Sequence, residues 1–435
     1  MTYAPRPTPI LLALLLACAP ALAQPTPSVD APPNVLALPV EPGLPALPAR
    51  VTLPELLELV RWRNPTLAAE RVRIDAARAD LITAGTLPNP TFSAARQRGT
   101  PGEPSEREVA IEQPLPIFGQ RGLRQENARL GIRTTQAQRD AAVAETLRSA
   151  AKAFVGLQIA QERERSWRAA EADFGLAARI VIGQVEAGAR SRYERTRIEV
   201  ETAAIASHTE ELQAATAEAA AQLAVLVGMP GWRPAVAERP ALPPVLPGTS
   251  ALWLQAQERL PTVRAALAEE AQARQRIEVE RREAWPVPAI GVGRLRDGEG
   301  RHNIIGVSVT IPLFDRNQGP IARARAEADE QRLRREAVLR EAEAELQRAA
   351  DQYQRRRQLA ERYERQAMAL LPELRRMAQD AYTLGSGGIL EFIDALQAVS
   401  ERQTAYLDLL EAALQADLDL QAASGAFGRS EGAPG

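Results

Sequence analysis

The sequence contains two copies of one pattern, about 196 residues apart, and this duplication limits the possible folds more than any other feature. Four pairs of landmarks share almost one offset: Asn64-Pro65 and Leu260-Pro261 at 196, Pro116-Ile117-Phe118 and Pro312-Leu313-Phe314 at 196, Gly188 and Gly385 at 197, and Leu87-Pro88 and Trp285-Pro286 at 198. A unit of this length is far longer than the repeats that stack into solenoids. The two halves of the chain should therefore fold in the same way.

Proline residues mark the boundaries of the two copies. Eight prolines lie among the 27 residues of 24–50 and six lie within 230–247, whereas none occurs from 117 to 229. Proline-rich stretches are extended, and proline-free stretches rich in Ala, Glu and Arg favour long helices. We therefore predict a Pro-rich N-terminal segment at 24–50, a first repeat at 51–228, a Pro-rich linker at 229–249, a second repeat at 250–424 and a flexible C-terminal tail at 425–435.

The N-terminus predicts export from the cytoplasm. An apolar run at 10–19 is too short to span a membrane, and Ala21-Leu22-Ala23 has the small-x-small pattern of a cleavage site. We expect a signal peptide at 1–23. The rival interpretation concerns Cys18, because Leu15-Leu16-Ala17-Cys18 resembles a lipoprotein box, which would make Cys18 a lipid anchor.

Each copy predicts the same order of elements. A helix of about 30 residues ends at a Pro-x-Pro sequence. Two short strands follow, at about 91–98 and 107–114 in the first copy and about 288–295 and 303–311 in the second. Apolar residues alternate with small or polar ones in the last of these, from Ile305 to Ile311, as in a strand with one apolar face. A very long helix comes next, at 120–187 in the first copy, and the chain returns as a second helix after a glycine-containing turn.

Four strands in one chain cannot form a closed barrel. An isolated hairpin is marginally stable in water, and small barrels need about eight strands. We therefore expect several chains to pool their strands in a membrane, with the helices continuing as a tunnel wall. Two alternatives remain open: a coiled-coil scaffold without a channel, and a periplasmic adaptor, which would need lipoyl-like and other β-rich domains.

Composition excludes several other classes of protein. The net charge of −2 lacks the basic bias of a nucleic-acid binder, and a mean hydropathy of −0.24 excludes a polytopic helical membrane protein. Two isolated histidines, His208 and His302, and one cysteine offer no metal-ligand spacing. Because no phosphate loop, nucleophile elbow or catalytic histidine arrangement occurs, we expect neither an enzyme nor a bound cofactor.

Five stretches resemble the TolC family of outer-membrane efflux channels. These are LPNP at 87–90, EQPLPIFGQRGLR at 112–124, VEAGARSRYE at 185–194, VTIPLFDRNQG at 309–319 and YTLGSGGILEFIDALQA at 382–398. The second is most similar to the CzcC-type branch, which is associated with heavy-metal export. The similarity extends over nearly all of 51–424.

This resemblance implies a mainly α fold with a small β part. In the family, a homotrimer forms a 12-stranded barrel in outer-membrane lipid, and a long α-barrel continues it through the periplasm. The channel conducts substrate passively from an inner-membrane pump, here of the resistance-nodulation-division type, through a periplasmic adaptor protein. Metal cations are the expected cargo, with drug efflux and type I secretion as alternatives.

The helical turns are the first candidate site. A left-handed residue at Gly188 and Gly385 would end each helix in the ordinary way. The resemblance adds that such turns receive the helical hairpins of the adaptor. The residues expected to take part in docking are Gly188, Ala189, Gly385, Ser386, Gly387 and Gly388.

Two further groups complete the expected sites. Tyr382, Glu391 and Asp394 match family positions that narrow the inner end of the pore, and three copies of the two acids would form a ring that favours cations; an ordinary solvated face is the alternative. Related channels can carry a gate-bonding arginine where this chain has Gly387. Aromatic residues near the helix–strand junctions would form a girdle at the membrane interface or simply fill a crowded joint: Phe92, Phe118, Trp285 and Phe314.

Overall fold

The two copies fold alike. The computed structural model describes residues 47–98, 105–244, 249–297 and 299–428. The first copy contains α2 (Leu53–Arg63), α3 (Pro65–Gly85), β2 (Thr91–Gln97), β3 (Glu106–Pro114), α4 (Gln120–Glu186) and α5 (Arg192–Val227). The second contains α6 (Thr249–Arg259), α7 (Pro261–Glu283), β5 (Pro288–Arg296), β6 (Arg301–Val309), α8 (Gln318–Gln366), η2 (Met368–Leu370), α9 (Leu371–Thr383) and α10 (Ile389–Ala423). The expected signal peptide, Cys18, most of the Pro-rich N-terminal segment and the end of the tail lie outside the described residues.

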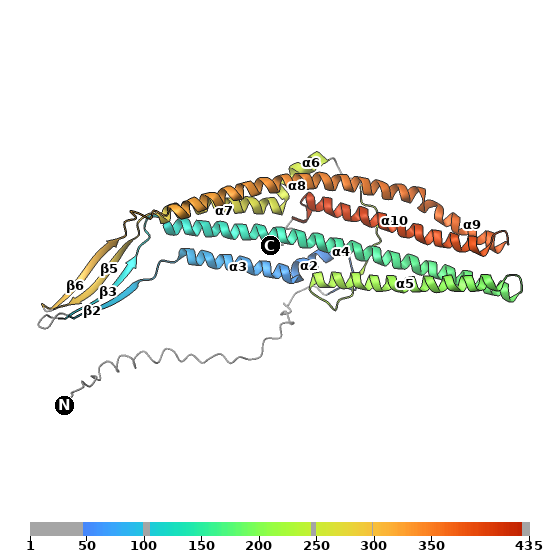
Figure 1. The fold of residues 1–435 in the computed structure, drawn as a ribbon, viewed down its shortest axis with the longest axis horizontal. Helices are drawn as coiled ribbons and strands as arrows, with labels where there is room; N and C mark the ends of the chain where they lie inside the picture. The colour runs from blue at the N-terminus through green and yellow to red at the C-terminus, as the bar shows by residue number, and fades with distance from the viewer. Residues whose placement is uncertain (1–46, 99–104, 245–248, 298, 429–435) are drawn as a thin grey trace, which may run out of the picture. The chain divides into compact units, whose positions relative to one another are not determined.

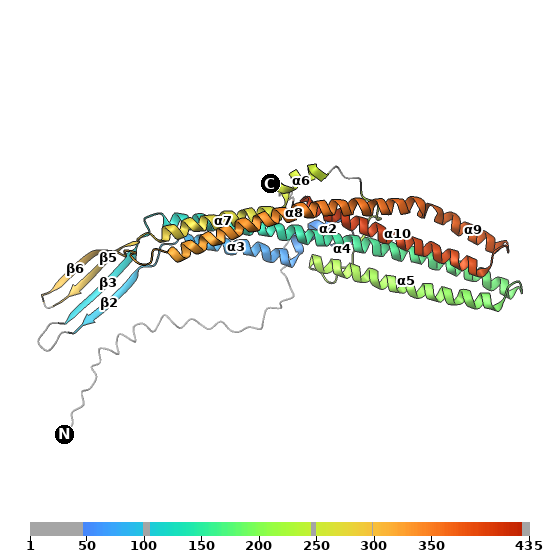
Figure 2. The same ribbon diagram turned by 45° about the horizontal axis from the view of Figure 1, so that its top comes forward.

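The fold is mainly helical with a small β part, as the sequence predicts. In the unit from Leu47 onward, the helices of both copies lie side by side, with the four strands at one end and the α4–α5 and α9–α10 turns at the other (Figures 1 and 2). The 67 residues of α4 span about 100 Å at 1.5 Å each. One long helix therefore connects the strands to the distant turn.

The first helix of each copy is broken, and the expectation of one continuous helix of that length is wrong. Asn64 between α2 and α3 and Leu260 between α6 and α7 have extended backbones. The following proline explains both breaks, since Pro65 and Pro261 lack an N–H and disfavour a helical residue before them. At the first break the Asn64 side chain is buried, accepts a hydrogen bond from the N–H of Leu67 (3.0 Å) and donates one to the carbonyl of Leu226 (2.7 Å).

Replacing Asn64 with alanine is expected to lower the thermal midpoint of the folded protein. The change leaves the buried N–H of Leu67 and the partly buried carbonyl of Leu226 without these partners, at a cost of about 1–3 kcal/mol for a fully buried group and less for the carbonyl. Circular dichroism at 222 nm measures the midpoint. Asn64→Asp keeps the acceptor for Leu67 but not the donor, so its midpoint should lie between the two; an alanine variant as stable as the wild type would contradict the prediction.

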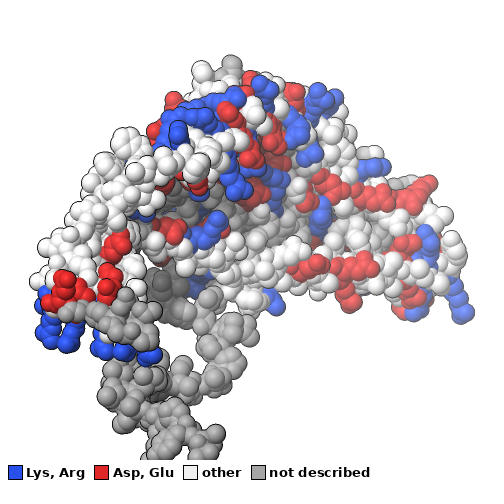
Figure 3. All heavy atoms as spheres, turned by 60° about the vertical axis from the view of Figure 1, so that its left-hand side comes forward, with Lys and Arg blue, Asp and Glu red and all other residues white. Residues whose placement is uncertain are grey.

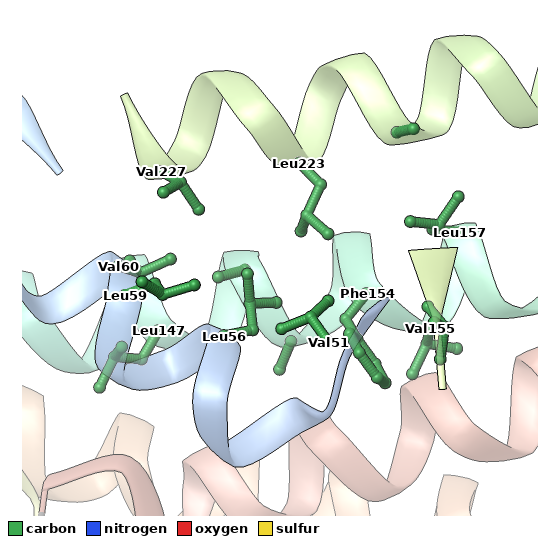
Figure 4. Packing of buried hydrophobic residues seen from close by; sticks show 14 of the residues in the cluster. Val51, Leu56, Leu59, Val60, Leu147, Phe154, Val155, Leu157, Leu223 and Val227 are labelled. Atoms are coloured by element: carbon green, nitrogen blue, oxygen red, sulfur yellow. The ribbon is translucent and has the colours of Figure 1, made fainter. Parts of the chain in front are cut away.

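A short parallel strand pair joins the end of the Pro-rich N-terminal segment to the Pro-rich linker. Here β1 (Arg50–Val51) pairs with β4 (Ala235–Val236), and the indole N–H of Trp232 donates a hydrogen bond to the carbonyl of Pro48 (3.0 Å). Val51 is fully buried in the largest apolar cluster, which brings together α2, α4, α5 and α10 (Figure 4). The described parts of the two Pro-rich segments are thus held against the helices. Proline content alone did not predict this pairing.

Candidate functional site

The four strands form one antiparallel sheet in the order β2-β3-β5-β6. Direct partners across the sheet include Phe92 with Ile111, Ile111 with Val292, and Val292 with Ile305. In the part of the chain that the structure describes, the outer edges of β2 and β6 have no strand partner. An unpaired edge presents free backbone N–H and C=O groups, so both edges of this sheet are open to pairing with strands of other chains.

One face of the sheet is apolar. Residues directly opposite each other point to the same side, and the side alternates along each strand. The central rows of this face carry large apolar side chains that are exposed in the single chain: Phe92, Val109, Ile111, Ile290, Val292, Ile305, Val307 and Val309. We call this set the apolar face. Figure 3 shows the strands as the largely white region toward the left, with charged atoms gathered at its lower end.

The opposite face of the sheet carries several glycines and acidic side chains. Glycines Gly291, Gly293 and Gly306 lie on it, and the hydroxyl of Ser308 donates a hydrogen bond to the carboxylate of Glu112. Glu106 and Glu108 share this side by register. Sequence reasoning missed these carboxylates as a group, although their spacings of two and four residues in β3 were the available signal.

The expected aromatic residues lie at the base of the sheet. Phe118 and Trp285 contact each other with ring centroids 5.6 Å apart. Arg282 stacks over Trp285 at 4.8 Å and donates a hydrogen bond to the carbonyl of Phe118 (2.9 Å). Phe314 is 93% exposed, and Phe92 lies on the apolar face itself. The structure thus brings Phe118 and Trp285 together and leaves Phe314 free in the described chain to contact lipid or another chain.

The two helical turns lie at the far end of the chain from the strands. Gly188 (φ +74°) and Gly385 (φ +77°) adopt the left-handed conformation, which a glycine accepts without strain. After the first turn, Ser191 and Glu194 form a capping box at the start of α5. The other expected docking residues, Ala189, Ser386 and Gly388, are exposed, and Gly387 is partly buried.

Tyr382 lies in the core that joins these turns. It is 1% exposed, stacks on Phe392 with ring centroids 5.1 Å apart, and has the guanidinium of Arg190 above its ring at 5.1 Å. Burial raises the pKa of the Tyr382 phenol above its ordinary value, which already leaves the ring neutral at neutral pH. Arg190 lies in the first turn and Tyr382 precedes the second, so this contact links the two hairpins; sequence reasoning did not find Arg190.

Glu391 and Asp394 lie on the exposed side of α10 near its start. The Glu391 carboxylate accepts a hydrogen bond from the N–H of Gly388 (3.2 Å), so Glu391 also caps the helix. Acidic residues near a helix N-terminus are favoured by the helix dipole. The geometry thus gives Glu391 a structural role beside the expected one in the pore.

The described helices and acidic or histidine side chains bear on membrane insertion and on metal binding. None of the described helices is both long enough and apolar enough to cross a membrane. Likewise, no group of three or more His, Cys, Asp or Glu side chains there could hold a metal ion. His208 contacts Trp167, with ring centroids 4.2 Å apart, and His302 lies 3.4 Å from Asp297.

Known proteins are similar to this chain in sequence and in fold. No family model matches the chain. It is 27% identical over 286 residues to the cobalt-zinc-cadmium resistance protein CzcC of Cupriavidus metallidurans, covering 64% of this chain and 67% of that protein. It is also 27% identical over 300 residues to the nickel-cobalt-cadmium resistance protein NccC of Alcaligenes xylosoxydans xylosoxydans, covering 65% and 67%. The solved outer-membrane channel OprN has the same fold, with a TM-score of 0.70 at 19% identity over 86% of this chain and 89% of that one.

Proposed function

We infer that this chain, which belongs to the TolC family of outer-membrane efflux channels, is the exit duct of a tripartite efflux system that exports metal cations. The observation that carries the proposal is the four-stranded sheet with an apolar face and two open edges. Three such sheets pair edge to edge into a 12-stranded barrel, whose apolar face contacts outer-membrane lipid. The helices continue the duct on the periplasmic side.

The turns at the far end are the proposed docking site of the periplasmic adaptor. The residues of the two turns have small side chains or none, so the helices of a partner can approach closely. They are Gly188, Ala189, Gly385, Ser386, Gly387 and Gly388. Leu384 beside them is 82% exposed, and an exposed apolar side chain is available to a partner. The adaptor connects the duct to an inner-membrane pump of the resistance-nodulation-division type.

The proposal that metal cations are the cargo rests on the acidic side chains that line the duct. The sheet face opposite the apolar one faces the duct and carries Glu106, Glu108 and Glu112, and Glu391 with Asp394 forms a second acidic ring at the inner end. Carboxylate rings attract cations and repel anions without chelating them. CzcC and NccC are named as cobalt, zinc, cadmium and nickel resistance proteins, which favours metal export over drug efflux or protein secretion.

Conductance measurements on the purified protein in planar bilayers test this function. We expect a trimer with cation-selective conductance, and deletion of the gene in its host should lower tolerance of cobalt, zinc or cadmium. A protein that extracts from cells without detergent and conducts no ions would support a coiled-coil scaffold or a soluble adaptor instead.

Removing the charge of the inner acidic ring is expected to weaken cation selectivity. The variant is Glu391→Gln with Asp394→Asn, because glutamine keeps an acceptor for the capped N–H of Gly388 while losing the charge. The reversal potential in a KCl gradient reports selectivity. Glu401→Gln, farther along α10, is a control that removes one exposed charge outside the ring and should leave selectivity unchanged. An unchanged reversal potential in the double variant would exclude the inner ring as a selectivity element.

A further inference from the structure

An arginine row crosses the sheet at the loop end of the strands. Arg96 pairs with Arg107, Arg107 with Arg296, and Arg296 with Arg301, so four guanidinium side chains lie directly opposite one another on four consecutive strands. We call these four residues the arginine row. The first two belong to one copy of the duplication and the last two to the other, so only the strand register reveals the row.

Charge is separated by face at this end of the sheet. The arginine row and Arg294 lie on the same side as the apolar face, whereas Glu106, Glu108 and Glu112 lie on the other side. Within the four strands, which the structure describes in full, the side of the apolar face carries no carboxylate. Among the residues of the strands, the row therefore has no acidic neighbour on its own side.

Like charges directly opposite each other on neighbouring strands destabilise a sheet. All four side chains of the row are exposed, and in the described chain none of them forms an ion pair. A row of this kind is stable when an external anion lies against it. Phosphate suits it best, because the planar guanidinium fork binds phosphate oxygens in a bidentate manner.

The position of the row points to a lipid. Arg301 lies four residues beyond Ile305 on the same side of β6, about 13 Å along the strand. The row thus borders the apolar face at its loop end. If the apolar face contacts hydrocarbon, as the proposed function requires, these side chains reach the headgroups of the outer leaflet.

We propose that the arginine row binds the phosphate groups of phosphorylated glycolipids in the outer leaflet of the outer membrane. The inference rests on the proposed function, which supplies the membrane and its orientation. In a trimer the row repeats in each chain and surrounds the barrel. It anchors the rim of the barrel at the headgroup level, opposite the Phe118–Trp285 pair at the base.

Native mass spectrometry of the purified trimer tests the proposal with two probes, diphosphorylated lipid A and the same lipid with both phosphates removed. The wild type should bind the diphosphorylated form at least about tenfold more tightly. Replacing the whole row with glutamine (R96Q, R107Q, R296Q and R301Q) should remove this preference. A charge-matched variant on the exposed side of α8 (R334Q, R340Q, R348Q and R355Q) should retain it.

Three results would overturn the proposal: equal binding of the two lipids by the wild type, an unchanged preference in the row variant, or full displacement of the lipid by millimolar inorganic phosphate, which would indicate a site for the free ion. Bilayer conductance of each variant separates this inference from the proposed function. A row variant that conducts normally but has lost the lipid preference supports the inference, whereas a wild type that forms no conducting trimer counts against the exit duct itself.

Discussion

Replacing Ile305 with arginine is expected to abolish the outer-membrane trimer. Ile305 is 81% exposed in the single chain and lies in the middle of β6 on the apolar face. An arginine at the centre of the lipid-facing band of a barrel costs about 2–4 kcal/mol. Since the trimer carries three copies, the total cost of about 6–12 kcal/mol is comparable to the whole stability of an ordinary domain.

The neighbouring residue provides the control. Ile304 has a similar side chain but points to the acidic face, where it is 39% exposed. Ile304→Arg places the same charge in the water-filled lumen and should leave the trimer intact. The measurement is the fraction of protein that migrates as an SDS-resistant trimer in outer-membrane fractions. Equal loss in both variants, or in neither, would contradict the assignment of the two faces.

The pattern of this strand shows what sequence alone could reveal. Strict alternation from Ile305 to Val309 predicted both the strand and its apolar face, because side-chain direction follows directly from a period of two. The structure ends β6 at Val309, although the alternation continues to Ile311. Pro312 follows and cannot donate to a ladder, which is consistent with pairing that stops before it.

Contacts between the two copies were beyond the reach of the sequence. The arginine row depends on the register between β3 and β5, whose residues are more than 170 positions apart, and no local pattern specifies such pairing. The break at Asn64 was missed as well, but there Pro65 gave a local signal, because the residue before a proline disfavours the helical region. Local conformation was therefore predictable, while the sites assembled from both copies required the three-dimensional packing.

The contact between Arg190 and Tyr382 is also a site assembled from both copies. Gly387 stands where related channels can carry a gate-bonding arginine, and an added Cβ there would lie 3.2 Å from a carboxylate oxygen of Glu391 and 3.3 Å from the Cβ of Ala381. The turn around Gly387 is thus too close-packed for a larger side chain without a shift of its neighbours. Arg190, supplied by the other hairpin, offers a cation at the same end of the chain.

Replacing Arg190 with glutamine is expected to raise the resting conductance of the channel. Any opening that separates the two hairpins must break the contact between the guanidinium and the Tyr382 ring, which is worth about 0.5–2 kcal/mol. Three copies acting together would shift the balance by about 1.5–6 kcal/mol, or about tenfold to ten-thousandfold in the open population. Single-channel recording of the purified trimer measures the change.

Two variants test whether the Tyr382 ring and the Arg190 charge hold the channel closed. Tyr382→Phe keeps a ring under Arg190 and loses only a hydroxyl that has no hydrogen-bond partner in the described chain, so its conductance should stay low. Arg190→Lys keeps the cation and should lie between the wild type and Arg190→Gln. Because Arg190 also lies 3.5 Å from Glu194, Glu194→Gln tests the ion pair separately, and a rise in conductance there equal to that of Arg190→Gln would assign the closed state to the ion pair instead of the ring contact.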